Sequence, residues 1–176
     1  HSLTAAMDPE DLVAFLNRHF DPLAGIVFRH DGMIAHYLGD RLLAAWGVPY
    51  PHDDHPLRAV TAAVEMQLMV EALNQAREKD AQPPIEIGIG ITTGTVVAGM
   101  IGAQKTRRYT VIGEAVKEAQ VICASARAEQ ILIALGLDVG DAVGVQQHGH
   151  RGLQAGQGQG LALVDRVVGR DGVAQV

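Results

Sequence analysis

The most informative part of the chain is the run Arg108-Tyr109-Thr110-Val111-Ile112-Gly113-Glu114-Ala115-Val116-Lys117. Its β-branched first half ends at Gly113 and passes directly into residues that favour a helix, so the run predicts a strand followed by a helix. The corner between such a strand and helix can present backbone or side-chain groups to a nucleotide. The run therefore indicates a local structure and a class of ligand together.

The whole chain has the size and composition of one domain with an aliphatic core. It has 176 residues, of which 48% are hydrophobic and only 4% aromatic, and this is enough to build a substantial core. We therefore expect residues 1–176 to form a single domain. The formal net charge of -6 is spread along the sequence without a basic block, which argues against nucleic acid as the main partner.

Cysteine content and hydropathy limit the cellular setting. Cys123 is the only cysteine, so an intrachain disulfide and a cysteine-cluster metal site are both excluded. Its apolar neighbours favour a buried, inert thiol. No apolar run is long enough to span a bilayer and no signal peptide is visible. We expect no membrane contact by this segment and a cytoplasmic location, whether or not it is part of a larger membrane-anchored or multidomain signalling protein.

The first half of the chain predicts the order helix, strand, strand, helix. Asp8-Pro9-Glu10-Asp11 has the features of a helix start, and apolar residues then recur at helical spacing until Gly32. Residues 33–38 and 42–46 are predicted to be strands joined by a tight turn at Gly39-Asp40. A loop then leads into a second helix over residues 56–79.

The second half predicts mainly strands, in addition to the strand and helix of the run at 108–117. These strands are expected at residues 85–91, 95–101, 130–133 and 161–168. Thr92-Thr93-Gly94 is expected to turn the chain between the first two of them. Residues 149–160 are rich in Gly and Gln and predict a mobile loop.

This order of elements predicts the fold class. Helices are mixed with hairpins and do not alternate strictly with strands, which favours an α+β fold over a doubly wound sheet. We expect a ferredoxin-like core in which a mixed, mainly antiparallel sheet is flanked by helices.

Four segments of the chain resemble one family in consistent order, the catalytic domain of class III adenylate and guanylate cyclases. Residues 8–20 are similar to the first helix of that domain, and residues 36–47 to the hairpin that carries a metal-binding aspartate. Residues 51–59 resemble the entry into the second helix. Residues 88–113, with Tyr109 to Gly113, resemble the central strands and signature. Together the segments cover roughly residues 1–133, so we identify the chain as a degenerate member of the family.

The resemblance implies a chemistry and a set of partners. In the family, two aspartates bind two divalent ions, Mg²⁺ or Mn²⁺, which activate the ribose 3′-hydroxyl of ATP or GTP and hold the triphosphate for in-line attack. The site forms between two subunits packed head to tail. The expected partner is therefore a second copy or a different cyclase domain, as a homodimer or a heterodimer.

Asp40 matches the second metal-binding aspartate of the family. A carboxylate at a hairpin turn is exposed and is a suitable hard ligand for these ions, although Gly-Asp is also an ordinary turn dipeptide. The first metal aspartate is expected on a strand just before residue 1. Asp40 alone cannot make the two-metal site, so we expect bound Mg²⁺ or Mn²⁺ only where that first aspartate is present.

The other positions that the resemblance assigns to the site carry different residues. Lys117 stands at the position of the asparagine that orients ribose, and Val121 at that of the arginine that neutralises phosphate charge. His36 stands at the purine-selecting lysine, and its partner position is Thr110, a residue able to hydrogen-bond a base edge. The phosphate-binding lysine is expected in the loop before the last strand, where residues 154–160 contain none.

Other features have competing interpretations. His52-Asp53-Asp54-His55 suggests a metal site, but an aspartate that caps the following helix is the simpler interpretation. Gly88, Gly90 and Gly94 suggest a phosphate loop, but the helix that such a loop needs is missing, which favours close packing and turns. The basic cluster over residues 105–108 is either a solvated hairpin tip or a contact to a triphosphate or partner.

Three functional hypotheses follow from these residues. The first is a cyclase homology domain that has lost catalysis as a self-dimer and acts as a regulatory or dimerising module. The second is the metal-binding subunit of an asymmetric cyclase whose partner supplies the asparagine and arginine. The third is an active cyclase that makes cyclic AMP or cyclic GMP with Lys117 and His36 in unorthodox roles.

Overall fold

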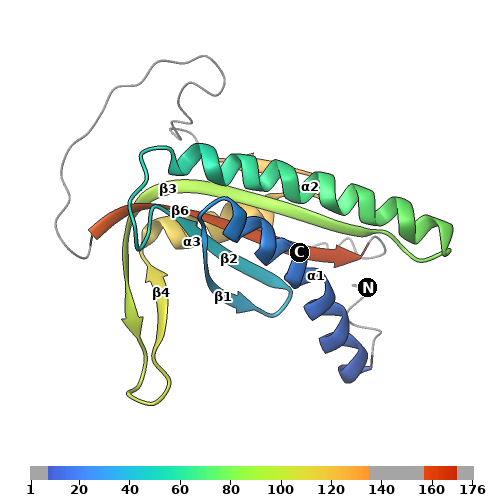
Figure 1. Ribbon diagram of the computed structural model, residues 1–176, viewed down its shortest axis with the longest axis horizontal. Coiled ribbons are helices and arrows are strands. Elements are labelled where there is room, and N and C mark those ends of the chain that lie inside the picture. The colour runs from blue at the N-terminus through green and yellow to red at the C-terminus, as the bar shows by residue number, and fades with distance from the viewer. Residues whose placement is uncertain (1–7, 135–156, 170–176) are drawn as a thin grey trace.

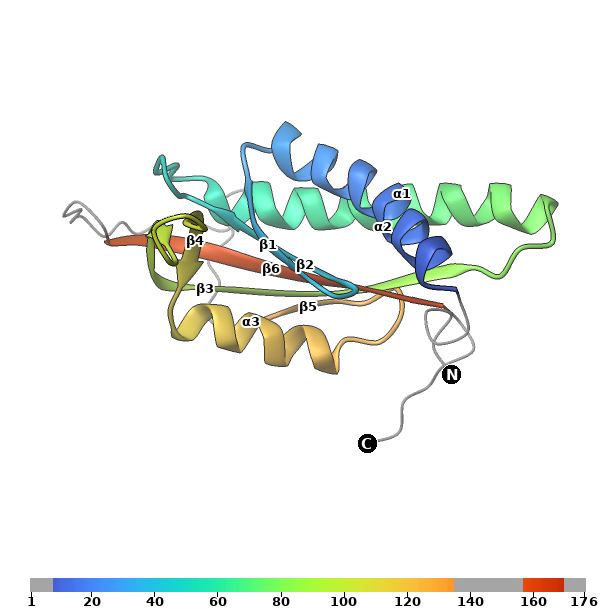
Figure 2. The same ribbon diagram turned by 90° about the horizontal axis from the view of Figure 1, so that it is seen from below.

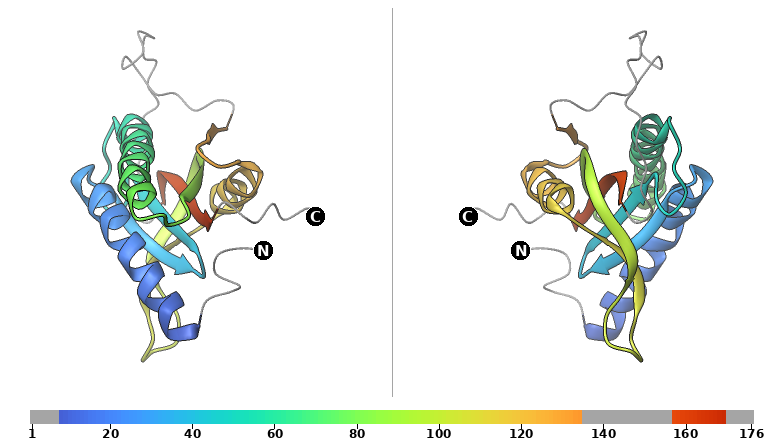
Figure 3. Two further views of the ribbon diagram at one scale, coloured as in Figure 1. Left: turned by 90° about the vertical axis from the view of Figure 1, so that its right-hand side faces the viewer. Right: turned by 90° about the vertical axis from the view of Figure 1, so that its left-hand side faces the viewer.

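The chain folds into a curved sheet with helices on both faces (Figure 1). The computed structural model describes residues 8–134 with their side chains and residues 157–169 as backbone. Helices α1 (Pro9–Arg29) and α2 (His55–Lys79) lie together on one face of the sheet, and α3 (Glu114–Ser125) covers the other (Figures 2 and 3). No helix among the described residues combines the length and apolar character needed to cross a membrane.

The sheet is mixed but mainly antiparallel, which confirms the predicted α+β class. Its six strands follow the order β1-β2-β6-β3-β4, with β5 also paired to β3. Among the pairings of the described strands, only that of β3 with β5 is parallel. The strands are β1 (Met33–Leu38), β2 (Arg41–Trp46), β3 (Ile85–Ile101), β4 (Arg108–Ile112), β5 (Ile131–Ile133) and β6 (Gln157–Gly169).

The predicted turn at Thr92-Thr93-Gly94 is wrong. β3 runs without interruption from Ile85 to Ile101, a strand of 17 residues. Gly94 is not among the glycines with positive φ; a Cβ there would lie 2.9 Å from the Ala115 Cβ, so it lets α3 approach the strand. The chain turns only after Ile101, where Gly102 adopts a φ of +130°.

The C-terminal strand begins earlier than its sequence predicted. β6 starts at Gln157, so the expected mobile loop is wrong for residues 157–160, and its remaining residues, 149–156, lie outside the described part. β6 also occupies the centre of the sheet, paired with β2 on one side and β3 on the other. β6 runs antiparallel to both of its neighbours. β2 and β3 are therefore parallel to each other, and β6 lies between them.

Two apolar cores lie on the two faces of the sheet. Alternate residues of β2 supply both, since Leu42 and Trp46 face α1 and α2 whereas Leu43 and Ala45 face α3. The larger core buries the isoleucines of the first half of β3 beneath α2. Cys123 belongs to the smaller core and is 1% exposed, as its apolar neighbours predicted.

The helix boundaries agree with the sequence, but the expected caps do not form. Asp8 and Asp54 occupy the N-cap positions of α1 and α2, and neither side chain makes a capping hydrogen bond. The Asp54 carboxylate instead accepts a hydrogen bond of 2.8 Å from Arg58 Nε. This pairing holds the pKa of Asp54 below its usual value, because the hydrogen bond from Arg58 favours the charged carboxylate.

Candidate functional site

The two positions that the resemblance assigns to purine selection meet in the folded chain. His36 lies on β1 and Thr110 on β4, and the His36 Nδ1 atom is 3.3 Å from the Thr110 Oγ1 atom. Both side chains are half-buried. They meet because the sheet is curved and its two outer strands in the strand order, β1 and β4, approach each other. Ala35 of β1 and Val111 of β4 therefore share one apolar core.

Burial also sets the charge of His36. The surrounding protein lowers the pKa of the imidazole below its usual 6.5, because removal from water disfavours the protonated form. A neutral ring and a hydroxyl can each donate or accept one hydrogen bond, depending on the histidine tautomer. The pair can therefore bind the edge of a base, but it provides no fixed positive charge.

Asp40 lies at the turn between β1 and β2. Gly39 before it adopts a φ of +60° with no neighbouring atom in the way, and this shapes the turn. The Asp40 side chain is 34% exposed, with Arg41 Nε 4.0 Å from its carboxylate. Within residues 8–134 no group of three or more His, Cys, Asp or Glu side chains could hold a metal ion. The described side chains thus supply one suitable oxygen ligand and do not make a complete two-metal site.

Lys117 and Val121 lie one turn apart on the outer face of α3. Their side chains are 71% and 66% exposed. Lys117 Nζ forms an ion pair of 2.6 Å with Glu114 on the preceding turn. Neither residue lies in the apolar core under the helix, so both side chains lie on the surface of the described part of the chain.

A hydrogen bond that the sequence did not reveal ties α3 to the central strand. The Thr92 hydroxyl, on a residue that is 1% exposed, donates to Glu118 Oε2 at 2.8 Å. Glu118 is the residue next to Lys117, so this bond fixes the part of α3 that carries Lys117 and Val121. The interpretation of Thr92 as a turn residue concealed it, because a turn threonine would face solvent.

The glycines of β3 and the histidines before α2 make structural contacts in the described part of the chain, and the basic cluster is exposed. Gly90 is forced by close packing, since a Cβ there would lie 2.3 Å from the backbone nitrogen of Cys123. His55, the first residue of α2, donates from Nδ1 to the backbone oxygen of His52 at 2.7 Å and so joins the helix to the loop before it. The basic residues at 105–108 are exposed at the tip of the β3–β4 hairpin, which extends away from the sheet (Figure 1).

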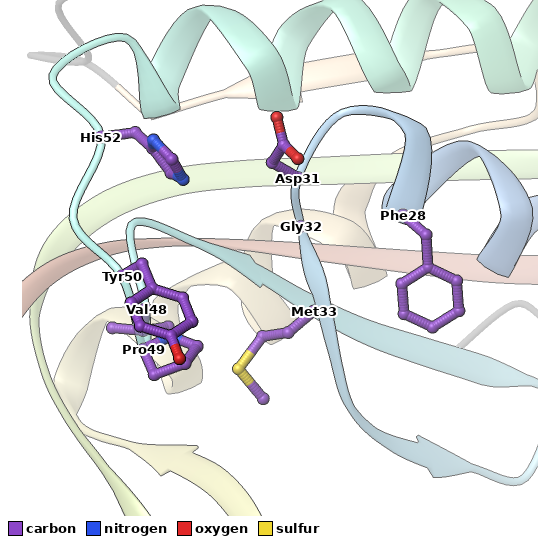
Figure 4. Close-up of a pocket in the computed structure, with 8 residues that line it drawn as sticks. All are labelled: Phe28, Asp31, Gly32, Met33, Val48, Pro49, Tyr50 and His52. Carbon is purple, nitrogen blue, oxygen red and sulfur yellow. The ribbon is translucent and has the colours of Figure 1, made fainter.

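A shallow pocket of about 260 Å³ opens at the end of the β1–β2 hairpin remote from Asp40. Figure 4 shows Met33 beside Tyr50 and Pro49, with Asp31 and His52 above them and Phe28 on the far side. None of the five predicted site residues lines it. The pocket is therefore separate from the candidate nucleotide site.

Comparison with known proteins identifies the family. A sequence model described as "Adenylate and Guanylate cyclase catalytic domain" matches residues 1–137. The chain belongs to this cyclase family. It is 33% identical to adenylate cyclase 1 of Rhizobium meliloti (strain 1021) over 118 residues, which are 67% of this chain and 18% of that protein.

Other relatives agree with the assignment. An uncharacterized protein of Mycobacterium tuberculosis (strain ATCC 25618 / H37Rv) is 33% identical over 127 residues, which are 71% of this cyclase-family chain and 22% of the relative. The chain thus spans about a fifth of the length of these curated relatives.

Solved cyclase domains share the fold. The crystal structure of the guanylyl cyclase Cya2 matches with a TM-score of 0.72 and 34% identity over 93% of this chain and 83% of that one. The adenylyl cyclase CyaB from P. aeruginosa matches with a TM-score of 0.74 over 99% of this chain and 89% of that one. Its identity of 22% shows the common fold alone.

Proposed function

We propose that this cyclase homology domain does not complete a catalytic site with a second copy of itself and serves as a regulatory or dimerising module of a longer signalling protein. The observation that carries the proposal is the outer face of α3, where Lys117 and Val121 stand exposed at the two positions that the family resemblance assigns to transition-state stabilisation. That residues 1–176 belong to a single domain and that this domain lies in the cytoplasm are part of the same proposal.

The chemistry of these two side chains supports the loss of activity. An arginine guanidinium binds phosphate oxygens through a planar fork of N–H donors, whereas the methyl groups of Val121 donate nothing. Arginine contacts to the transferred phosphoryl group accelerate such reactions by roughly 10³–10⁵-fold. Lys117 could replace part of that charge, but Glu114 lies 2.6 Å from its ammonium group and competes with a phosphate for it.

The geometry around His36 supports weak nucleotide binding. The hydrogen bond to Thr110 keeps the two base-reading positions together. The lowered pKa of His36 leaves the ring neutral near pH 7, so it cannot supply the positive charge that a lysine would. We expect ATP and GTP to bind weakly and without strong selection between the two bases.

A second candidate is the metal-binding subunit of an asymmetric cyclase. Asp40 favours it, since the carboxylate is partly exposed at the hairpin turn. In this arrangement Asp40 and an aspartate from a preceding strand would hold Mg²⁺ or Mn²⁺, and a different cyclase domain would contribute the asparagine and arginine. The heterodimer, and not the homodimer, would then be the active form.

Nucleotide cyclisation assays distinguish the candidates. Formation of cyclic AMP and cyclic GMP is measured with Mn²⁺ in the complete protein that contains this domain, alone and mixed with a cyclase domain bearing the asparagine and arginine. No product from the protein alone is expected under the leading proposal. Product only in the mixture, abolished by Asp40→Asn, supports the asymmetric enzyme. Robust product from the protein alone would refute both and favour an unorthodox active enzyme.

Restoring the family residues provides the matched test. Lys117→Asn with Val121→Arg changes two exposed side chains, so it should leave the fold intact. Product from the double variant, with none from either single variant, would place the loss of activity at these two positions. If the double variant remains inactive although it folds and dimerises, these substitutions are not the cause.

A further inference from the structure

The two most exposed aromatic side chains of the described residues lie at one pocket. Phe28, near the end of α1, is 60% exposed, and Tyr50, in the loop between β2 and α2, is 76% exposed. Both line the pocket of about 260 Å³ that also contains the thioether of Met33 (Figure 4). The chain has only three phenylalanines, three tyrosines and one tryptophan. Two of these few rings are thus left out of the core and placed around a single hollow in the surface.

The end of α1 forms one side of the pocket, and its backbone is fixed. The amide of Asp31 donates to Phe28 O at 3.1 Å, and the amide of Gly32 donates to Val27 O at 2.9 Å. These two hydrogen bonds end the helix in a Schellman motif. Asp31 adopts a φ of +57° in this motif, a conformation that aspartate and asparagine tolerate better than most residues. The carboxylate of Asp31 is therefore presented from a rigid position.

The loop before α2 forms the opposite side of the pocket and is tied at both ends. Val48 at its start is 6% exposed and belongs to the core beneath α3. The backbone oxygen of His52 accepts hydrogen bonds from the His55 amide at 3.2 Å and from His55 Nδ1 at 2.7 Å. A pocket whose sides are already ordered costs less free energy to fill than one that the ligand must order.

The charge at the pocket is negative. Asp31 lines it, and Asp53 and Asp54 directly follow His52, which lines it too. The guanidinium of Arg58 binds Asp31 Oδ2 and Asp54 Oδ1, so one cation serves two of three carboxylates. Within residues 8–134 no hydrogen bond is made to the other oxygen of Asp31. This excess of negative charge favours a cationic ligand and disfavours a phosphate.

We propose that this pocket binds an organic cation, a guanidinium or alkylammonium group, carried either by a small amine or by an arginine or lysine side chain of a partner polypeptide. The ring faces of Tyr50 and Phe28 attract such a cation. The flexible side chain of Met33 packs against its alkyl stem. The second oxygen of Asp31 accepts a hydrogen bond from it.

Other classes of ligand fit the pocket less well. A metal ion needs several ligands, and within residues 8–134 no group of three or more His, Cys, Asp or Glu side chains could hold one. A phosphate would meet carboxylates, and Arg29, the other cation at this end of α1, is paired with Glu65. A wholly apolar ligand would cover the Asp31 carboxylate without a hydrogen bond to its second oxygen, which costs free energy.

Trp46 lies directly behind the pocket and reports binding. Gly32 lines the pocket, and a Cβ on it would lie 2.5 Å from Trp46 Cε2. The Trp46 Nε1 donates to His30 O at 3.0 Å, next to Asp31 in the chain. Because Trp46 is the only tryptophan, its indole N–H gives one signal in a ¹⁵N–¹H NMR spectrum.

Butylguanidinium and butylurea are matched probes, because they have nearly the same shape and only the first is charged. Each is titrated into the full 176-residue chain at constant ionic strength. The shifts of the Trp46 indole signal and of the amides at residues 28–33 and 48–52 are followed. We expect saturable shifts with butylguanidinium at a Kd of about 3 mM, and binding of butylurea at least about tenfold weaker. No saturable shift up to about 50 mM butylguanidinium, or equal binding of butylurea, would overturn the proposal.

Substitutions test the groups that bind the cation. Tyr50→Leu keeps an apolar side chain but removes the ring face, and Asp31→Asn removes the charge while asparagine still tolerates the positive φ. Each should weaken binding of butylguanidinium about threefold, and the two together about tenfold. Tyr37→Leu is the matched control, since Tyr37 is 49% exposed on β1 but does not line the pocket. Unchanged affinity in the double variant, with a native indole signal before the probe is added, would contradict the assignment.

A third probe distinguishes the two sources of the cation. The peptide acetyl-Gly-Arg-Gly-amide presents the same guanidinium group on a polypeptide backbone. Binding at least about tenfold tighter than that of butylguanidinium would assign the pocket to a partner polypeptide, because the backbone then adds contacts. Equal or weaker binding would assign it to a small organic cation. No arm of the test uses nucleotide turnover, so failure of this proposal would leave the proposed function standing, and the reverse also holds.

Discussion

His36 Nδ1 and Thr110 Oγ1 lie 3.3 Å apart although 74 positions separate the two residues in the chain. One side chain comes from the first strand of the sheet and the other from the signature run. Their contact requires β1 and β4 to curl toward each other over the core that Ala35 and Val111 share. The contact between these two predicted base-reading residues is therefore a property of the curved sheet as a whole.

The burial of two histidines predicts a dependence of stability on pH. Loss of hydration lowers the pKa values of His36 and His19 below 6.5 in the folded chain, so the unfolded chain binds more protons as the pH falls below that value. The free energy of unfolding should be highest above pH 6.5 and should decrease as the pH falls through the lowered values. Urea unfolding followed at a series of pH values measures this.

Substitution distinguishes the contributions of His36 and His19 to the dependence of stability on pH. His36→Gln removes the titrating ring but can still hydrogen-bond Thr110, so it should flatten the dependence of stability on pH below 6.5. His36→Gln combined with His19→Gln should flatten it further. The carboxylates of Asp54 and Glu65 have lowered pKa values and act at more acid pH. An unchanged slope near pH 6 in the double variant would show that other groups cause it.

Substitution by alanine at two glycines of β3 should change the stability of the domain by very different amounts. A Cβ at Gly90 would lie 2.3 Å from Cys123 N and 2.9 Å from Ala119 O, and these backbone atoms cannot move without shifting α3. Gly90→Ala should destabilise the domain by about 3 kcal/mol or more. Gly99 has no atom within 4 Å of such a Cβ, so Gly99→Ala should change stability by less than about 0.5 kcal/mol. Chemical denaturation measures both, and similar losses in both variants would contradict the packing of α3 on β3.

The bond between Thr92 and Glu118 predicts strong coupling in a double-mutant cycle. Glu118→Leu leaves the buried Thr92 hydroxyl without its partner, which should cost about 1–3 kcal/mol. Thr92→Val together with Glu118→Leu removes both polar groups and should be closer to neutral. The coupling energy from unfolding of the four chains should reach about 1 kcal/mol. Simple additivity of the two single effects would show that the hydroxyl is satisfied in another way.

The single tryptophan offers an optical test of the junction between α1 and β1. Trp46 is fully buried, and its Nε1 donates to His30 O at 3.0 Å. A Cβ at Gly32 would lie 2.5 Å from Trp46 Cε2, so Gly32→Ala should destabilise by about 2 kcal/mol and red-shift the emission. Gly25→Ala is the matched control, because the nearest atom to its Cβ is the flexible end of Arg29 at 3.7 Å. A native emission spectrum in Gly32→Ala would contradict the reported packing.

Local patterns predicted most of the elements because their causes are local. The proline in the first turn and the helical recurrence of apolar residues fixed α1, and the glycine at residue 39 fixed the β1–β2 turn. Local patterns gave the wrong prediction at Thr92-Thr93-Gly94. Two threonines followed by a glycine can occur in a turn, and they can equally occur in a strand that another element approaches closely. Only the position of Ala115, 21 residues further along, shows which of the two is present.

The sequence by itself determined the family, the order of the helices and of most strands, and the identity of the groups at each candidate site position, including the absence of a guanidinium at Val121. These depend on residue type and spacing along the chain. Only the tertiary structure decided that His36 meets Thr110, that Thr92 binds Glu118, and that β6 fills the centre of the sheet. Each of these depends on contacts between segments that are distant in the chain. The free energy of these contacts comes from packing and strand pairing across the sheet, so neither segment alone has a sequence pattern that predicts them.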